Sequence, residues 1–230
     1  MFSYYGSKSK LVEYYPPPKY NRIIEPFAGS ARYSLHNWKK DILLVDKYSV
    51  VIDLWKWLIN ATKKDILELP ILKKGDDIRE IEMPIEARYL IGFSINKGSS
   101  APRNIVTEWG ESGWNYTRKN IAQNLYKIKH WQIINSSYNE IQNETATWFI
   151  DPPYQFGGEH YKISNKKINF TELGEWCKNR NGQVMVCENT KADWLPFKPM
   201  IDFVGAYDTT TESIWSNYKT NYDYQQLSFL

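Results

Sequence analysis

The sequence predicts an α/β fold built on a mostly parallel sheet, with a small, mostly helical insertion. Short apolar runs recur along the chain, as expected for strands that are covered on both faces. Segments with helical periodicity lie between them, and strands that alternate with helices are typical of a parallel sheet. The 230 residues fit one large domain, or one domain with a sizeable insertion.

Five apolar runs are predicted to be strands. They are residues 22–25 (RIIE), 42–46 (ILLVD), 132–135 (QIIN), 147–151 (TWFID) and 183–188 (QVMVCE). Residues 201–206 and 218–230 could add closing strands as an antiparallel edge pair. The polar stretch 206–218 between them is expected to be a loop.

Helices are predicted between these runs. Residues 50–61 carry apolar side chains at i, i+3, i+4 and i+7, which are Val51, Leu54, Trp55 and Leu58. A helix from about Ala31 is expected after the first strand. Two more are expected over residues 117–130 and 170–178, with Thr117 and Thr171 as their N-caps.

Residues 62–116 interrupt the alternation of strands and helices. Residues 63–69 and 85–95 are predicted to be helical, and the sequence is irregular from Asn96 onward. We therefore expect one main domain made of residues 1–61 and 117–230, with residues 62–116 inserted into it.

Composition limits the class of protein. The net charge of +3 only weakly favours a polyanionic partner, while the 10 Trp and 17 Tyr exceed what a core needs and hint at stacking surfaces. Cys177 and Cys187 match no metal motif and are expected to be buried, reduced thiols. No apolar run approaches the roughly 20 residues that span a bilayer, and the N-terminus lacks a signal-peptide core. We expect a soluble, cytoplasmic protein without a membrane partner, most simply a monomer, with a dimer as the alternative.

The first motif, EPFAGSA, follows the strand at residues 22–25. Gly29 and Ser30 would let the backbone pass close to a ligand, and ligands of open α/β sheets bind at the carboxyl ends of strands. Asp46 ends the next strand, 21 residues after Glu25, where an acidic side chain can accept hydrogen bonds from ribose hydroxyls. A helix N-cap or a solvated strand end would explain Asp46 equally simply.

The second motif, DPPY, follows the strand at residues 147–151. Pro152 and Pro153 make the chain leave the strand rigidly, because proline fixes its own φ and extends the preceding residue. Asp151, the free carbonyl of Pro152 and the flat ring of Tyr154 together suit a planar group that carries an amino substituent. A proline-rich turn explains the prolines but not the aspartate and tyrosine.

In their order, these motifs resemble those of the Dam-like DNA-adenine N6-methyltransferases, the class whose prototype methylates GATC sites. That family has an aromatic–Gly–Lys motif, then E/D-P-F-x-G-x-G, an acidic strand end, a target-recognition insertion and DPPY. This chain has YYGSK, EPFAGSA, LLVDKYS, the insertion and DPPYQF, and the resemblance spans about residues 2–220.

The resemblance implies a Rossmann-like S-adenosylmethionine-dependent methyltransferase sheet that acts on double-stranded DNA. Residues 1–61 and 117–230 would form its catalytic domain and 62–116 its target-recognition region. Asp151, Pro152, Pro153 and Tyr154 would form the catalytic motif that holds the flipped adenine. The residues implied to bind the cofactor are Tyr4, Tyr5, Gly6, Lys8, Glu25, Pro26, Phe27, Ala28, Gly29, Ser30, Asp46, Ser137, Tyr138 and Asp151.

DNA contacts are expected from basic residues around the insertion and in the loop after DPPY. They are Arg103, Arg118, Lys119, Lys162, Lys166 and Lys167, for which a solvated charged surface is an equal alternative. Trp109, Trp114 and Tyr116 could reach the duplex, although core packing suits the two tryptophans as well. No metal is expected, because His36, His130 and His160 form no ligand cluster in the sequence.

The chain departs from the family pattern at two positions. The second glycine of G-x-G is Ala31, which fits if its φ is negative, and a large Arg32 follows. Two alternatives therefore stay open. One is methylation of RNA adenine or of cytosine N4, and the other is a nucleic-acid-binding protein whose cofactor site has decayed.

Overall fold

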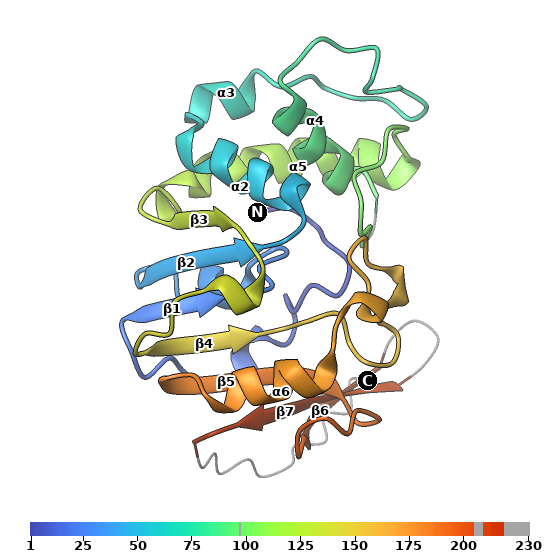
Figure 1. Ribbon diagram of the computed structural model, residues 1–230. Helices are drawn as coiled ribbons and strands as arrows, with labels where there is room; N and C mark the ends of the chain where they lie inside the picture. Colours follow the sequence, from blue (N-terminus) through green and yellow to red (C-terminus); the bar gives the residue numbers. More distant parts are fainter. Residues whose placement is uncertain (97, 205–208, 219–230) are drawn as a thin grey trace.

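Seven strands form one mixed sheet in the computed structural model, which describes residues 1–96, 98–204 and 209–218 (Figure 1). Their order across the sheet is β3-β2-β1-β4-β5-β7-β6. The first five strands are parallel, and β7 runs antiparallel to both of its neighbours. This is the Rossmann-like α/β sheet that the sequence predicts. The strands are β1 (Arg22–Glu25), β2 (Asp41–Asp46), β3 (Gln132–Asn135), β4 (Ala146–Ile150), β5 (Gly182–Asn189), β6 (Lys198–Val204) and β7 (Thr209–Ser216).

Both faces of the central strands are buried, which explains their continuous apolar runs. Alternate residues face opposite sides, so Ile23 belongs to one core and Ile24 to the other. The larger core contains helices α1 (Arg32–His36) and α2 (Ser49–Asn60), and α6 (Phe170–Lys178) covers the other face. The buried thiols of Cys177 and Cys187 lie on opposite sides of the sheet and are free, as predicted.

The insertion joins α2 in one group of helices beside the β3 edge of the sheet (Figure 1). Its helices are α3 (Lys63–Leu67), α4 (Ile85–Ser94) and α5 (Glu108–Asn124). Short 3-10 turns occupy the remaining loops, at Val12–Tyr14, Leu125–Lys127, Tyr138–Glu140, Gly158–His160 and Asn165–Lys167.

The prediction that a helix begins at Thr117 is wrong. Helix α5 begins nine residues earlier, and its N-cap is Thr107, whose side chain accepts a hydrogen bond from the Gly110 amide at 3.1 Å. A glycine is needed at position 110 of this helix because the end of α4 lies close to it: a Cβ there would lie 2.5 Å from the Ile95 carbonyl oxygen. The predicted domain boundary after residue 116 therefore falls inside a continuous helix.

Three other predictions also need correction. The stretch predicted as a polar loop contains β7, which pairs with β5 on one side and β6 on the other, and this position in the sheet buries Glu212 and Ser213. Strand β3 lies at the sheet edge and is mostly exposed rather than covered on both faces. Asn169, not Thr171, caps α6. Residues 219–230 of the expected last strand lie outside the described residues.

Candidate active site

One cavity lies at the carboxyl ends of β1, β2 and β4. The space among its lining residues that is free of protein atoms is about 950 Å³, open solvent included. All fourteen residues that the resemblance implies for the cofactor line this cavity, from the N-terminal segment 4–8 through the turn after β1 to Asp46, Ser137, Tyr138 and Asp151. The cavity thus joins the glycine turn to the DPPY motif, although the roles of the individual residues stay predictions.

Asp46 connects the glycine turn to the start of α2. One carboxylate oxygen accepts from the Gly29 amide at 3.0 Å, and the other accepts from the Tyr48 amide at 2.8 Å. Asp46 is not itself a helix N-cap, because Tyr48 is the N-cap of α2, but its carboxylate accepts from the amide of that N-cap residue. Burial raises the pKa of Asp46 to about 6. Each oxygen has a further lone pair, so the carboxylate can also accept from a ligand hydroxyl in the cavity.

Glu25 is the deepest carboxylate of the cavity. It is buried at the end of β1, and one oxygen accepts a hydrogen bond from the Ser34 amide at 2.7 Å. Burial raises the pKa of Glu25 to about 8. Near neutral pH the cavity therefore holds this side chain largely protonated, and a cationic ligand group beside it would favour its ionisation.

The two departures from the family pattern have local explanations. Ala31 has a φ of 47°, so the condition of a negative φ is not met, and the alanine occupies the left-handed region that a glycine adopts freely. Arg32 donates from Nε to the Ser7 hydroxyl at 2.9 Å and from Nη2 to the Phe2 carbonyl at 2.8 Å. The large side chain thus fastens the N-terminal segment to the turn after β1.

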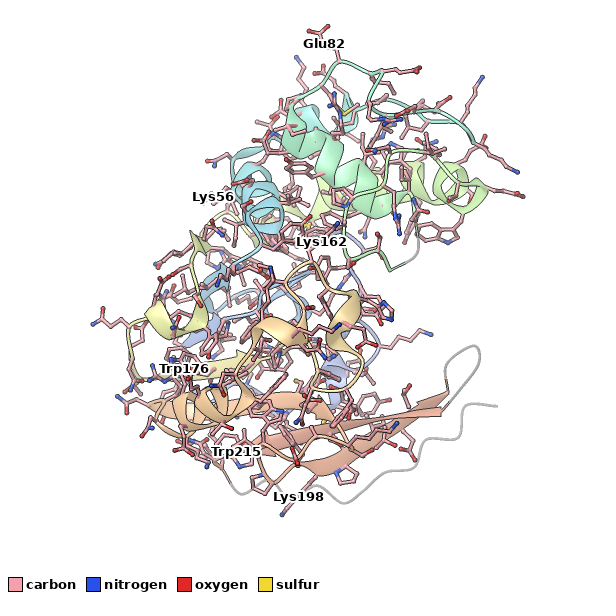
Figure 2. The ribbon with its side chains drawn as sticks, turned by 45° about the vertical axis from the view of Figure 1, so that its right-hand side comes forward. Lys56, Glu82, Lys162, Trp176, Lys198 and Trp215 are labelled. Carbon is pink, nitrogen blue, oxygen red and sulfur yellow. The ribbon has the colours of Figure 1, made fainter. Side chains whose placement is uncertain are left out.

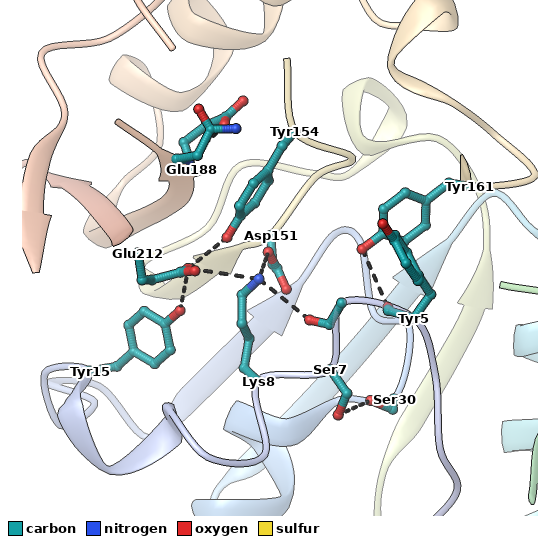
Figure 3. Close-up of polar contacts among 12 residues, drawn as sticks. Tyr5, Ser7, Lys8, Tyr15, Ser30, Asp151, Tyr154, Tyr161, Glu188 and Glu212 are labelled. Carbon is teal, nitrogen blue, oxygen red and sulfur yellow. Dashed lines mark hydrogen bonds and ion pairs between the residues drawn. The ribbon is translucent and has the colours of Figure 1, made fainter. Parts of the chain in front are cut away.

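Asp151 forms an ion pair inside the cavity (Figure 3). The Lys8 ammonium lies 3.1 Å from Asp151 Oδ1, while 21% of the aspartate side chain stays exposed. Burial raises the pKa of Asp151 to about 6, although Lys8 acts in the opposite direction. The YYGSK motif therefore reaches the DPPY motif directly.

Tyr154 and Pro152 do not line the cavity. The Tyr154 hydroxyl donates to Glu212 Oε1 at 2.6 Å, and the Lys8 ammonium lies 4.5 Å from the centre of its ring (Figure 3). Glu212 was missed in the sequence because it belongs to the stretch predicted as a loop. A lone glutamate between threonines and a serine carries no motif that would have revealed it.

The loop after DPPY closes one side of the cavity. Tyr161 packs its ring edge-to-face on Tyr5, with centroids 5.1 Å apart, and its hydroxyl donates to the Tyr5 carbonyl at 3.3 Å. Gly6 makes this approach feasible, because a Cβ there would lie 2.0 Å from the Tyr161 hydroxyl oxygen. The Ser100 hydroxyl of the insertion donates to the His160 carbonyl at 2.7 Å. The loop is thus fastened to both the N-terminal segment and the insertion.

The predicted DNA-contacting residues separate into two groups. Arg118 is buried in α5 and donates to the carbonyls of Leu67 and Leu69, so it holds the end of α3 and is not available to a phosphate. Trp114 is a core residue, whereas Trp109 and Tyr116 are exposed. The other predicted cations are exposed, and Figure 2 shows Lys162 where the loop after β4 meets the insertion. These are Arg103, Lys119, Lys162, Lys166 and Lys167, of which Lys167 also lines the cavity.

In residues 1–96, 98–204 and 209–218, no three His, Cys, Asp or Glu side chains are grouped so that they could hold a metal ion. No helix of the same ranges combines the length and the apolar character that crossing a membrane requires.

Comparison with known proteins gives only distant similarities. No protein-family model and no curated protein matches the sequence. Among solved structures, a conserved hypothetical protein of Streptococcus pyogenes is 10% identical with a TM-score of 0.36, and the match covers 90% of each chain. A structure named "Putative methyltransferase yhhF from Escherichia coli" is also 10% identical, with a TM-score of 0.34, over 84% of this chain and 74% of that one. At these scores neither similarity assigns a function.

Proposed function

We propose that this chain transfers the methyl group of S-adenosylmethionine to the N6 amine of adenine in double-stranded DNA. The observation that supports this proposal best is that one cavity joins Asp46 and the glycine turn to Asp151 of the DPPY motif. A decayed cofactor site is less consistent with this arrangement, because Ala31 and Arg32 leave the turn continuous with the cavity.

The side chains of the cavity fit such a cofactor. Asp46 and Asp151 face a ligand that carries a sulfonium and an ammonium group, and Glu25, protonated without a ligand, would ionise beside such a cation. Asp46 would accept from the ribose hydroxyls, and the turn at Gly29 would lie against the methionine part. The rings of Phe27 and Tyr138, whose centroids are 5.5 Å apart, both border the cavity where the adenine of the cofactor would be held.

Asp151 would hold one hydrogen of the target amine, and the Pro152 carbonyl, which does not line the cavity, would have to turn toward it to hold the other. When bound, the cofactor supplies a methyl group on a positively charged sulfur, which the N6 lone pair displaces in line. Because that lone pair is delocalised into the purine ring, acceptors that favour a pyramidal nitrogen would lower the barrier. Asp151 need not be a strong base, since the proton can leave after the nitrogen becomes cationic.

The target adenine must leave the duplex to reach this cavity, and base flipping costs a few kcal/mol. We propose that the exposed lysines of the loop after β4 offset part of this cost through phosphate contacts. Lys162 and Lys166 are exposed on that loop, and Lys167 is exposed at the cavity itself. Stacking by Tyr154 would require its ring to move from the position that its hydrogen bond to Glu212 holds.

The test is methyl transfer from tritium-labelled cofactor to DNA and to RNA, followed by nucleoside analysis. We expect N6-methyladenine from duplex DNA, and sequencing of methylated DNA from expressing cells would then give the recognition site. Label in RNA adenine or in cytosine N4 would replace the proposed substrate by one of its alternatives. No calorimetric binding of the cofactor at millimolar concentration would favour a non-catalytic binder.

Replacing the carboxylate of Asp151 tests its role directly. Asp151→Ala is expected to lower methyl transfer by about a thousandfold or more, because the amine loses its charged acceptor. Cofactor binding, measured by calorimetry, should largely persist. Asp53→Ala removes a carboxylate of α2 that does not line the cavity, and it serves as the matched control. Full turnover by Asp151→Ala would show that the amine-holding role is misassigned.

A further inference from the structure

Glu212 is a buried carboxylate in a strand that needs none for its fold. Only 3% of the residue is exposed, and its β7 neighbour on the same face, Ile214, belongs to the larger core. Burial of a carboxylate is strongly unfavourable unless it is paired and hydrogen-bonded. An apolar side chain would therefore suit this position better if β7 had only a structural role.

The recorded contacts of Glu212 converge on the residues of the two motifs. Its Oε1 accepts from the Tyr154 hydroxyl at 2.6 Å and from the Tyr15 hydroxyl at 2.7 Å, and it lies 3.7 Å from the Lys8 ammonium (Figure 3). Tyr154 belongs to DPPY and Lys8 to YYGSK. Tyr15 belongs to neither motif. It is a buried core residue, and its hydroxyl helps to fix the position of the Glu212 oxygen.

Lys8 lies between two carboxylates. Its ammonium is 3.1 Å from Asp151 and 3.7 Å from Glu212, so one positive charge is shared by two negative ones. Burial alone would lower the pKa of Lys8, but the two carboxylates outweigh it and raise that pKa above its ordinary value. Without Glu212, the lysine would pair with Asp151 alone.

We propose that Glu212 is a positioning residue of the methyl transfer: it shares Lys8 with Asp151, which leaves Asp151 free to accept a hydrogen bond from the target amine, and it holds the phenol of Tyr154 until the target base is bound. This inference rests on the proposed function. It also has a consequence that does not depend on catalysis: the charge of Glu212 influences the protonation of Asp151.

The charged groups around Asp151 determine in which direction its pKa moves when Glu212 loses its charge. Among the groups of the described residues that act on Asp151 or that it acts on, Lys8 alone is a cation. They are Lys8 and Tyr15 of the N-terminal segment, Glu25 of β1, Tyr154 and Tyr161 after β4, Cys187 and Glu188 of β5, and Glu212 of β7. Since the negative charge of Glu212 raises the pKa of Asp151, Glu212→Gln should lower it.

The experiment follows the carboxyl carbon of Asp151 by NMR across pH 5–8 in Glu212→Gln, alongside kcat at each pH. We expect the Asp151 midpoint and the acid limb of kcat to move to lower pH by about one unit. The kcat itself should fall about tenfold to a hundredfold, because Lys8 then pairs with Asp151 alone and competes with the target amine for its oxygens. Cofactor affinity should stay close to that of the wild type.

Glu188→Gln is the matched control. Glu188 is also a buried carboxylate of the sheet, but it accepts from the Gln155 and Asn189 amides and from the Trp194 indole rather than from Lys8 or Tyr154. Its variant should move the Asp151 midpoint less than Glu212→Gln does, because Glu188 acts on Asp151 through charge without pairing with Lys8. Tyr15→Phe, which removes one donor to Glu212, should lower kcat less than Glu212→Gln and gives a second test if that variant does not fold.

The outcomes separate this inference from the proposed function. An Asp151 midpoint that is the same in Glu212→Gln as in the wild type, or that moves equally in Glu188→Gln, would overturn the inference. A wild-type chain that methylates no nucleic acid would overturn the proposed function and the effect on kcat. The link between Glu212 and Asp151 would then still be decided by the NMR midpoints.

Discussion

Ala31 shows how one residue can depart from a motif and keep its geometry. Its left-handed conformation costs an alanine about 1–2 kcal/mol relative to a glycine. A glycine would lose the burial of one methyl group, about 0.8 kcal/mol. It would also lose about 0.5–1 kcal/mol more entropy on folding. These terms nearly cancel, which explains why the fold tolerates alanine where the family pattern has glycine.

We therefore expect Ala31→Gly to leave the free energy of unfolding almost unchanged. Ala31→Val should lower it by about 2 kcal/mol or more, since a β-branched residue rarely adopts a positive φ. Chemical denaturation of both variants measures the difference. Equal stability of the glycine and valine variants would contradict the left-handed conformation at this position.

The protonation of Glu25 makes the stability of the chain depend on pH. Its pKa is raised by burial from 4.5 to about 8, so the folded state binds the proton more tightly than the unfolded state. The stabilisation is complete below the unfolded pKa and is lost as pH rises through about 8, with a total on the order of a few kcal/mol.

Glu25→Gln keeps an acceptor for the Ser34 amide but removes the titration. We expect this variant to be more stable relative to the wild type at pH 9 than at pH 6, as measured by urea unfolding at both values. A stability difference that is the same at the two pH values would show that Glu25 does not change its protonation on folding.

At the scale of elements, strands with apolar sequences were predicted correctly, whereas elements with polar sequences were not. Strands β1, β2, β4 and β5 are covered on both faces, so their sequences identify them without knowledge of the neighbours. Strand β7 was not predicted, because its position in the sheet and not its composition buries Glu212 and Ser213. The start of α5 was not predicted, because Gly110, which permits close helix packing, is also typical of a turn.

Two glycines of α5 allow a matched test of that packing. Gly110→Ala should destabilise the chain by about 1–3 kcal/mol, because a Cβ would lie 2.5 Å from the Ile95 carbonyl oxygen. Gly113→Ala meets nothing closer than 3.9 Å and should stabilise the helix by up to about 1 kcal/mol. Opposite shifts in thermal unfolding are expected, and a shared direction would rule out the close approach of α4 and α5.

At the scale of the whole molecule, the residues of the site could be predicted but not their partners. Short motifs identified Asp46, Asp151 and Lys8, because each motif keeps its residues together in the chain. The ion pair of Lys8 with Asp151 and the hydrogen bonds of Glu212 join segments that only the order of the strands brings together. Arg118 was predicted as a DNA contact for the same reason: sequence does not reveal which way a side chain of α5 faces.

The adjacent residues Arg118 and Lys119 separate stability from DNA binding. Lys119→Ala should leave the stability nearly unchanged and reduce the slope of log affinity against log salt by about 0.9 if the lysine contacts one phosphate. Arg118→Ala should destabilise the chain by removing the donor to the α3 carbonyls, without changing that slope. Salt titrations of DNA binding and thermal unfolding measure the two effects, and an altered slope in Arg118→Ala alone would reverse the assignment.

The position of β7 between β5 and β6 has a consequence for synthesis on the ribosome. Strand β6 emerges first, yet it reaches the rest of the sheet only through β7. A nascent chain that ends before residue 209 therefore exposes the edge of β5 and lacks Glu212. Completion of the sheet and completion of the charge arrangement at Asp151 are one event, which occurs only after this late strand has been translated.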